Sequence, residues 1–184
     1  MHYFSRLQNT IKANWERTAL ANFRGESFTY GELATQIARF HVFFETVGLK
    51  KGDKVALCAK NSARWGITFF AANTYEAVLV PILADFNPEA VNSLVDHSES
   101  KVLLTDTDIW NKLDIAKMPT VQAVFSSSDF SLLYAADAKV QEACDKLDQL
   151  FEAKYPNGYT ADMLSYPIDN DTDLAIINYT SGTT

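Results

Sequence analysis

Residues 51–59 read Lys-Gly-Asp-Lys-Val-Ala-Leu-Cys-Ala, a glycine turn that runs into five apolar residues in succession. An unbroken apolar run of this length is typical of a strand buried on both faces, as the strands of parallel sheets are. A second such run covers residues 77–83, and residues 101–105 and 120–125 are also strand-like. Helical stretches separate these strands, and strand–helix repetition with short connections indicates a parallel sheet. The sequence therefore predicts an α/β fold with a mostly parallel sheet flanked by helices.

Local signals set the ends of the predicted helices. Asn61-Ser62 can cap a helix that runs on through Phe70, and Pro88 suits the first position of the next helix, where its missing N–H costs nothing. A longer helix begins near Gly31 and ends at Gly48, because glycine accepts the left-handed conformation of a C-terminal cap.

Periodicity and turn residues also predict the structure of the segments before and after these strands and helices. At the start, apolar residues at helical spacing predict a helix, and residues 19–23 and 27–30 predict a hairpin. Further along, residues 126–136 carry a serine triplet and predict an exposed excursion, and residues 138–154 predict one continuous helix. Residues 174–177 predict a last apolar strand.

Bulk composition excludes several classes of protein. A length of 184 residues fits one large domain or a domain plus part of another. The net charge of −7 argues against a nucleic-acid binder, which needs a basic face. No apolar run approaches the ~20 residues of a membrane span, and the first residues do not resemble a signal peptide. We therefore expect a cytoplasmic protein with no integral membrane segment, and leave open a peripheral position at the inner membrane surface.

The residues after the last predicted strand carry the candidate chemistry. They read Tyr179-Thr180-Ser181-Gly182-Thr183-Thr184. Ligands of open α/β sheets bind beyond the carboxyl ends of the strands, hydroxyl groups donate hydrogen bonds to anions, and glycine lets backbone N–H groups approach closely. These properties predict a polyphosphate site, although hydroxyl-rich turns after strands are usually only turns. The predicted phosphate-binding residues are Thr180, Ser181, Gly182, Thr183 and Thr184.

Other reactive side chains predict no further site. Asp169, Asp171 and Asp173 open like a calcium loop, but Leu174 stands where that loop needs glycine, so a solvated acidic turn is the preferred interpretation and no metal site is expected. His41 is interpreted as a partly buried, hydrogen-bonded histidine. We expect Cys58 to be a buried reduced thiol, and Cys144 to lack an activating partner. No catalytic residue is expected within the 184 residues.

The terminal hexapeptide resembles the start of the signature loop of the adenylate-forming, or AMP-binding, superfamily. The likeness extends upstream and is closest in style to the long-chain fatty-acid–CoA ligases. The further stretches that carry it are residues 28–33, 48–57, 61–65, 78–81, 87–89 and 96–101. One departure is Tyr75-Glu76, which adds bulk where family members usually have a small pair.

The resemblance implies a function. Enzymes of this family bind ATP with Mg²⁺, join a carboxylate to the α-phosphate as an acyl-adenylate, and transfer the acyl group to the thiol of coenzyme A. Residues 1–184 are then expected to form the N-terminal portion of the AMP-binding large domain, with the terminal hydroxyls around the phosphates.

The same resemblance suggests a long-chain fatty acid as the substrate; an aryl or medium-chain acid is the alternative. The expected partners are small molecules, and homo-oligomerisation is left open. The 184 residues alone are expected to be inactive, because the family's remaining functional residues lie downstream. A rival interpretation is a non-catalytic α/β binding or scaffold domain.

Overall fold

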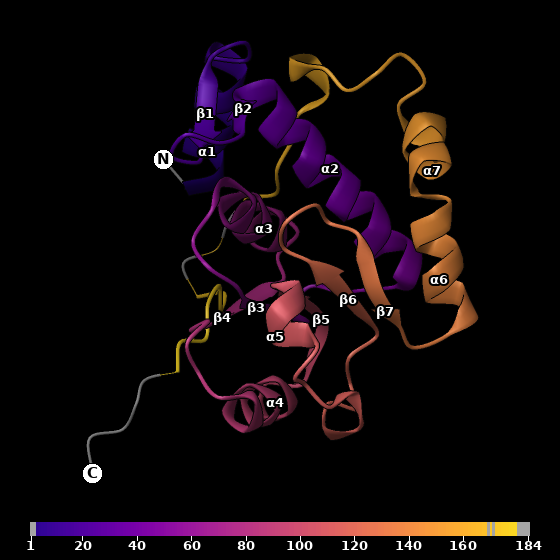
Figure 1. The fold of residues 1–184 in the computed structure, drawn as a ribbon. Coiled ribbons are helices and arrows are strands. Elements are labelled where there is room, and N and C mark those ends of the chain that lie inside the picture. The colour runs from indigo at the N-terminus through magenta and orange to yellow at the C-terminus, as the bar shows by residue number, and fades with distance from the viewer. Residues whose placement is uncertain (1–2, 169, 171, 180–184) are drawn as a thin grey trace.

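A computed structural model describes residues 3–168, 170 and 172–179 of the chain. The helices and strands in chain order are α1 (Tyr3–Ala13), β1 (Thr18–Ala21), β2 (Ser27–Thr29), α2 (Tyr30–Val47), β3 (Lys54–Cys58), α3 (Ala63–Thr74), β4 (Val78–Ile82), α4 (Pro88–His97), β5 (Ser100–Thr105), α5 (Thr107–Trp110), η1 (Ile115–Lys117), β6 (Ala123–Ser126), β7 (Leu132–Ala135), α6 (Ala138–Asp145), α7 (Leu147–Lys154) and η2 (Ala161–Met163) (Figure 1). No helix within these described ranges is long and apolar enough to cross a bilayer.

A five-stranded sheet in the order β4-β3-β5-β6-β7 forms the centre of the molecule. The β4–β3, β3–β5 and β5–β6 pairs are parallel, and β7 is antiparallel to β6. Helices α2 and α3 cover one face of the sheet, and α4 covers the other (Figure 1). The prediction of a mostly parallel sheet flanked by helices is therefore confirmed.

Strand β3 shows why the apolar run was decisive. Val55 and Leu57 pack into the cluster formed with α2 and α3, whereas Ala56 and Cys58 pack on the α4 side. All four side chains are completely buried. Successive side chains of a strand point to opposite faces, so burial of both faces requires apolar residues at every position.

The predicted ends of the helices agree with the structure. Thr29 and Glu32 form a reciprocal capping box at the start of α2, and Gly48 ends that helix with a φ of 81°. Ser62 accepts a hydrogen bond from Trp65 N at the start of α3. Pro88 is the first residue of α4.

Two predictions for the later part of the chain are wrong. Residues 126–136 do not form only an exposed excursion, because Leu132–Ala135 is β7 and extends the sheet beside β6. Ser126 N donates to Ser131 O (2.8 Å), which closes the serine-rich turn into a hairpin. The predicted helix 138–154 is divided at Lys146 into α6 and α7, which pack against different clusters along α2.

Gly31 lies in the first turn of α2, where the indole of Trp15 passes closely. A Cβ added at Gly31 would lie 2.6 Å from Trp15 Cε2 and 2.6 Å from Nε1. Gly31 N also donates to Trp15 O (2.8 Å). Because both the backbone and the ring hold this contact, the space is too small for a methyl group.

We expect Gly31→Ala to lower the free energy of unfolding by about 1–3 kcal/mol, as overpacking does. Gly66→Ala is the matched control, because its Cβ would meet only the Leu20 side chain, with Cδ1 at 3.2 Å. Alanine also favours a helix interior over glycine by up to ~1 kcal/mol, so Gly66→Ala should be neutral or stabilising. Urea denaturation of both variants makes the comparison, and equal effects would show that the Trp15 contact is not limiting.

His41, on α2, is half-buried and hydrogen-bonded to α3, which confirms its interpretation as a partly buried, hydrogen-bonded histidine. Its Nε2 lies 3.2 Å from Ala71 O and 3.1 Å from Thr74 Oγ1. Burial lowers the pKa of His41 from 6.5 to about 4, since the surroundings disfavour the charged ring.

This pKa predicts a loss of stability in acid. Between pH 6.5 and about 4 the unfolded chain binds a proton that the folded His41 does not, so the free energy of unfolding falls as the pH falls. The loss from this residue should approach about 3 kcal/mol. His41→Gln should flatten the slope of unfolding free energy against pH in that window; an unchanged slope would mean that His41 does not titrate in this way.

Candidate functional site

The predicted phosphate-binding residues Thr180, Ser181, Gly182, Thr183 and Thr184 lie outside the described residues. The segment that leads to them is described as far as Tyr179. Leu79 N donates to Ala175 O (3.0 Å), and Ile177 N donates to Leu79 O (2.9 Å). Ile176 therefore forms a parallel bridge with Leu79, which places this segment beside β4 at the edge of the sheet.

The bridge is shorter than the predicted strand over residues 174–177. In a parallel ladder the next hydrogen bond would come from the backbone of residue 81. Residue 81 is Pro81, which has no N–H to donate. The ladder therefore stops after one bridge, and the segment departs from the sheet towards the carboxyl end of β4.

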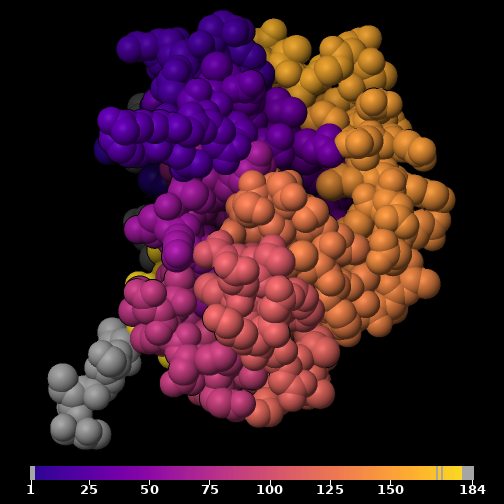
Figure 2. Space-filling model, in the orientation of Figure 1, coloured from indigo at the N-terminus to yellow at the C-terminus, as the bar shows by residue number. Residues whose placement is uncertain are grey.

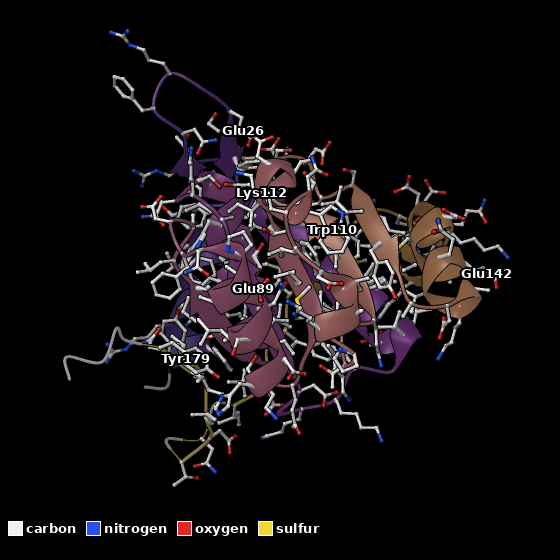
Figure 3. The ribbon with its side chains drawn as sticks, turned by 60° about the horizontal axis from the view of Figure 1, so that its bottom comes forward. Glu26, Glu89, Trp110, Lys112, Glu142 and Tyr179 are labelled. Carbon is white, nitrogen blue, oxygen red and sulfur yellow. The ribbon has the colours of Figure 1, made fainter. Side chains whose placement is uncertain are left out.

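Tyr179 lies at the end of the described chain and is anchored to α4 (Figure 3). Its hydroxyl lies 2.8 Å from Nδ1 of His97, the last residue of α4. Their rings meet nearly edge to face, at 74°. This contact fixes the position of the residue immediately before the candidate phosphate-binding residues.

A cleft of about 630 Å³ opens beside Tyr179. Its walls come from the carboxyl ends of β3 and β4 and the residues that follow them, together with Trp65 of α3; the lining includes Lys60, Asn61, Asp85 and Tyr179. Lys60 supplies a cation and Asn61 an amide, and Lys60 N is held by Asp106 Oδ2 (3.2 Å). The cleft thus lies where ligands of open α/β sheets bind, beyond the carboxyl ends of parallel strands.

Lys60 and Asp85 line the cleft but belong to no sequence motif that predicts a site. Lys60 follows the predicted strand 55–59 directly, and Asp85 follows the predicted strand 77–83 closely. Their positions just beyond parallel strands were the available signal, since those ends meet at one edge of the sheet.

In the described part of the chain, the two cysteines and the acidic residues before the bridge add no reactive side chain to the cleft. Cys58 is a buried free thiol, and burial raises its pKa to about 12; burial raises the pKa of Cys144 to about 11. Asp169 and Asp171 lie outside the described residues, whereas Asp173 forms an ion pair with Lys51. In the described part of the chain, no three acidic, histidine or cysteine side chains lie close enough to hold a metal ion.

Lys51 joins three turns at the opposite, amino end of the strands. Its Nζ lies 2.7 Å from Glu76 Oε1 and 2.7 Å from Asp173 Oδ2. Both hydrogen bonds raise the pKa of Lys51, and the bond to Asp173 has the larger effect. The ion pairs link the turns before β3 and β4 to the segment that forms the bridge with Leu79.

Tyr75 and Glu76, the departure from the family pattern, are accommodated at this same end. Tyr75 donates a hydrogen bond to Leu49 O (2.9 Å), and its ring packs against Phe44. Glu76 adopts a left-handed backbone with a φ of 63° and lines a small cavity of about 230 Å³. Neither residue lines the cleft beside Tyr179.

Because Glu76 has a left-handed backbone, glycine and alanine at this position should have different effects on the free energy of unfolding. Glu76→Gly loses an exposed ion pair, worth up to ~1 kcal/mol, but relieves a left-handed strain of about 1 kcal/mol, so the free energy of unfolding should change little. Glu76→Ala loses the ion pair and keeps the strain, so it should be less stable than Glu76→Gly by about 1 kcal/mol. Urea denaturation tests this order, and an alanine variant as stable as the glycine variant would contradict it.

Comparison with known proteins identifies relatives over most of the chain. The family profile described as AMP-binding enzyme matches residues 7–184. A probable chloroplastic acyl-activating enzyme 16 of Arabidopsis thaliana is 28% identical over 166 residues, which cover 86% of this chain and 23% of that protein. The long-chain-fatty-acid–CoA ligase FadD15 of Mycobacterium bovis is 29% identical over 158 residues, covering 85% of this chain and 24% of the relative.

Solved structures share the fold. The anthranilate CoA ligase AuaEII, solved in complex with anthranoyl-AMP, superposes with a TM-score of 0.75 at 16% identity, covering 100% of this chain and 32% of that structure. The chain therefore spans about a quarter of the length of the two relatives and about a third of this structure.

Proposed function

The chain belongs to the AMP-binding enzyme family, and from this premise we propose that its 184 residues are the N-terminal portion of the large domain of an ATP-dependent acid–CoA ligase. The observation that carries the proposal is the position of Tyr179. It lines a cleft at the carboxyl ends of β3 and β4, and the candidate phosphate-binding residues follow it directly.

The proposed reaction joins a carboxylate to the α-phosphate of ATP and releases pyrophosphate. Coenzyme A then receives the acyl group from the adenylate. The site must stabilise negative charge on the phosphates as it is redistributed, and preorganised hydrogen-bond donors do this most effectively. Thr180, Ser181, Gly182, Thr183 and Thr184 are the proposed donors.

Two features of the cleft beside Tyr179 support a nucleotide as its ligand. The cleft has a volume of about 630 Å³, and Lys60 adds a cation to its wall. We assign no residue of the chain to the family's Mg²⁺, since such an ion is usually bound by one or two carboxylates together with substrate phosphates.

The proposed substrate is a long-chain fatty acid. The long-chain-fatty-acid–CoA ligase among the relatives favours it. An aryl acid is the second candidate, because the anthranilate CoA ligase shares the fold. The proposed location is the cytoplasm, where ATP and coenzyme A are available, with peripheral contact to the inner membrane surface if the acid comes from lipid.

A non-catalytic binding or scaffold domain remains the rival from another class. The two proposals differ in what the reading frame encodes after Thr184. Continuation with glycine, proline, lysine and glycine residues, as in the family's signature loop, would support the enzyme. A stop codon directly after Thr184 would support the scaffold.

Acyl-adenylate formation tests the proposal. The intact enzyme, assayed by ATP–pyrophosphate exchange with acids of different chain length and with aryl acids, should be active, whereas the 184 residues alone should be inactive. Thr183→Ala in the intact enzyme should lower kcat at least ~tenfold, because a donor to the phosphates is lost. Thr172→Ala, at an exposed threonine, is the matched control and should leave kcat unchanged. Exchange activity in the 184 residues, or a Thr183→Ala variant with full activity, would contradict these assignments.

A further inference from the structure

A second cavity, of about 470 Å³, lies between α2, the β6–β7 turn and the start of α7. It shares no lining residue with the cleft beside Tyr179. The surface is recessed where α2 passes behind β6 and β7 and beside α7 (Figure 2). Its volume falls within the range of small-molecule sites, roughly 300–1,000 Å³.

Four phenylalanine rings form one wall of this cavity. The Phe40 and Phe130 rings meet edge to face with centroids 4.8 Å apart, and the Phe43 and Phe125 rings do so at 4.9 Å. Phe43 and Phe125 are buried in the core, which holds the wall rigid. Aromatic rings in such arrangements favour a further flat ring in offset or edge-on contact.

Phe130 is held in a strained conformation. Its φ is 62°, in the left-handed region that bulky residues avoid. Hydrogen bonds of the surrounding turn keep it there, with Phe130 N donating to Ser126 O (3.0 Å) and Ser126 N donating to Ser131 O (2.8 Å). Strain of this kind is concentrated at ligand sites, and here it places an aromatic ring against the cavity.

One stripe of α2 supplies two rings of the aromatic wall and two polar side chains beside them. Gln36, Arg39, Phe40 and Phe43 stand at spacings i, i+3, i+4 and i+7 and all line the cavity. Arg39 pairs with Asp148, whose side chain is 76% exposed. An ion pair so open to water is weak, so a ligand carboxylate can replace Asp148. The side-chain amide of Gln36 makes no hydrogen bond within the described ranges, which leaves it available.

The other charged groups of the cavity are already engaged. Arg64 donates to both carboxylate oxygens of Glu26, at 3.0 and 2.9 Å, and Glu26 stands at the base of the projecting turn between β1 and β2 (Figure 3). Asp129 accepts hydrogen bonds from Ser131 N (3.0 Å) and Ser131 Oγ (2.7 Å), and the positive charge of Arg64 acts on it. Arg39 is therefore the cation that can change partner.

We propose that this cavity binds a small aromatic carboxylic acid of one or two rings, with the ring against Phe40 and Phe130 and the carboxylate at Arg39 and Gln36. The planar guanidinium of arginine matches a carboxylate with two parallel hydrogen bonds. Such a ligand is bound and not activated, because the cavity lies apart from the cleft in which the adenylation chemistry is proposed. The inference therefore goes beyond the proposed function.

Equilibrium titration of the full chain with 2-naphthoate, in the absence of ATP, tests this site. We expect saturable binding at about 1 mM or tighter. Arg39→Met keeps the aliphatic stem but removes the carboxylate partner, and should weaken binding about tenfold. Gln36→Met should weaken it less. Phe130→Gly removes one wall and relieves the left-handed strain, so it should stay folded and lose at least as much affinity as Arg39→Met.

Controls separate this cavity from other binding. Arg24 has its guanidinium 5.1 Å from the Phe23 ring and lies in the β1–β2 turn, outside the cavity; Arg24→Met should leave the affinity unchanged. The alcohol 2-naphthalenemethanol should bind more weakly than 2-naphthoate and be insensitive to Arg39→Met. Cyclohexanecarboxylate, which lacks the flat ring, should also bind more weakly.

Two outcomes would overturn the proposal. One is the absence of saturable binding of 2-naphthoate to the wild-type chain. The other is binding that neither Arg39→Met nor Phe130→Gly weakens, which would place the acid elsewhere, for instance at the activation site. Because the measurement needs no ATP, its failure leaves the proposed ligase activity untouched, and loss of that activity would not affect this result.

Discussion

Complete burial of β3 on both faces is the constraint from which the rest of the structure follows. The strand pairs with β4 on one side and β5 on the other, so its backbone hydrogen bonds are satisfied within the sheet. Its side chains from Val55 to Cys58 have no exposure to water. Helices are therefore required on both faces of the sheet. A slip of β3 by one residue would turn every one of its side chains to the opposite face, so the register is fixed. The cleft at the carboxyl end of β3 takes its position from this fixed register.

The segment that carries the candidate phosphate-binding residues is positioned by a few contacts at the edge of that sheet. Lys51 holds it at the amino end of the strands through Asp173, and Leu79 holds it at the bridge. Pro81 then ends the ladder, and Tyr179 is fixed to His97 on α4. Because its pairing with β4 is limited to one bridge, the segment can turn towards the cleft after Ile176. The contacts before and after the bridge keep its path fixed. The exposed ion pairs contribute little stability individually, so their role is mainly geometric.

The two cavities differ in the chemistry that they present. The cleft beside Tyr179 lies at strand ends, where the parallel sheet brings together polar groups such as Lys60 after β3 and Asp85 after β4. The cavity beside α2 is lined by core phenylalanines and the half-buried Phe130, together with Arg39. Charged phosphates suit the first, and a flat apolar body with one charge suits the second.

The sequence by itself determined the features whose causes lie within a few residues. The apolar run 55–59, the caps at Gly48 and Ser62, and the start of α4 at Pro88 depend on local backbone preference and on periodicity, and each was predicted correctly. So was the family, because its motifs are contiguous. Only the tertiary structure decided that residues 132–135 extend the sheet, that residues 138–154 divide at Lys146, and that Pro81 limits pairing with a segment ninety-odd positions later. It also decided the cavity that joins α2 to Phe125 and Phe130. These outcomes depend on which segments, far apart in the sequence, pack against each other. The packing free energy belongs to the pair of segments, so it cannot be deduced from either segment alone.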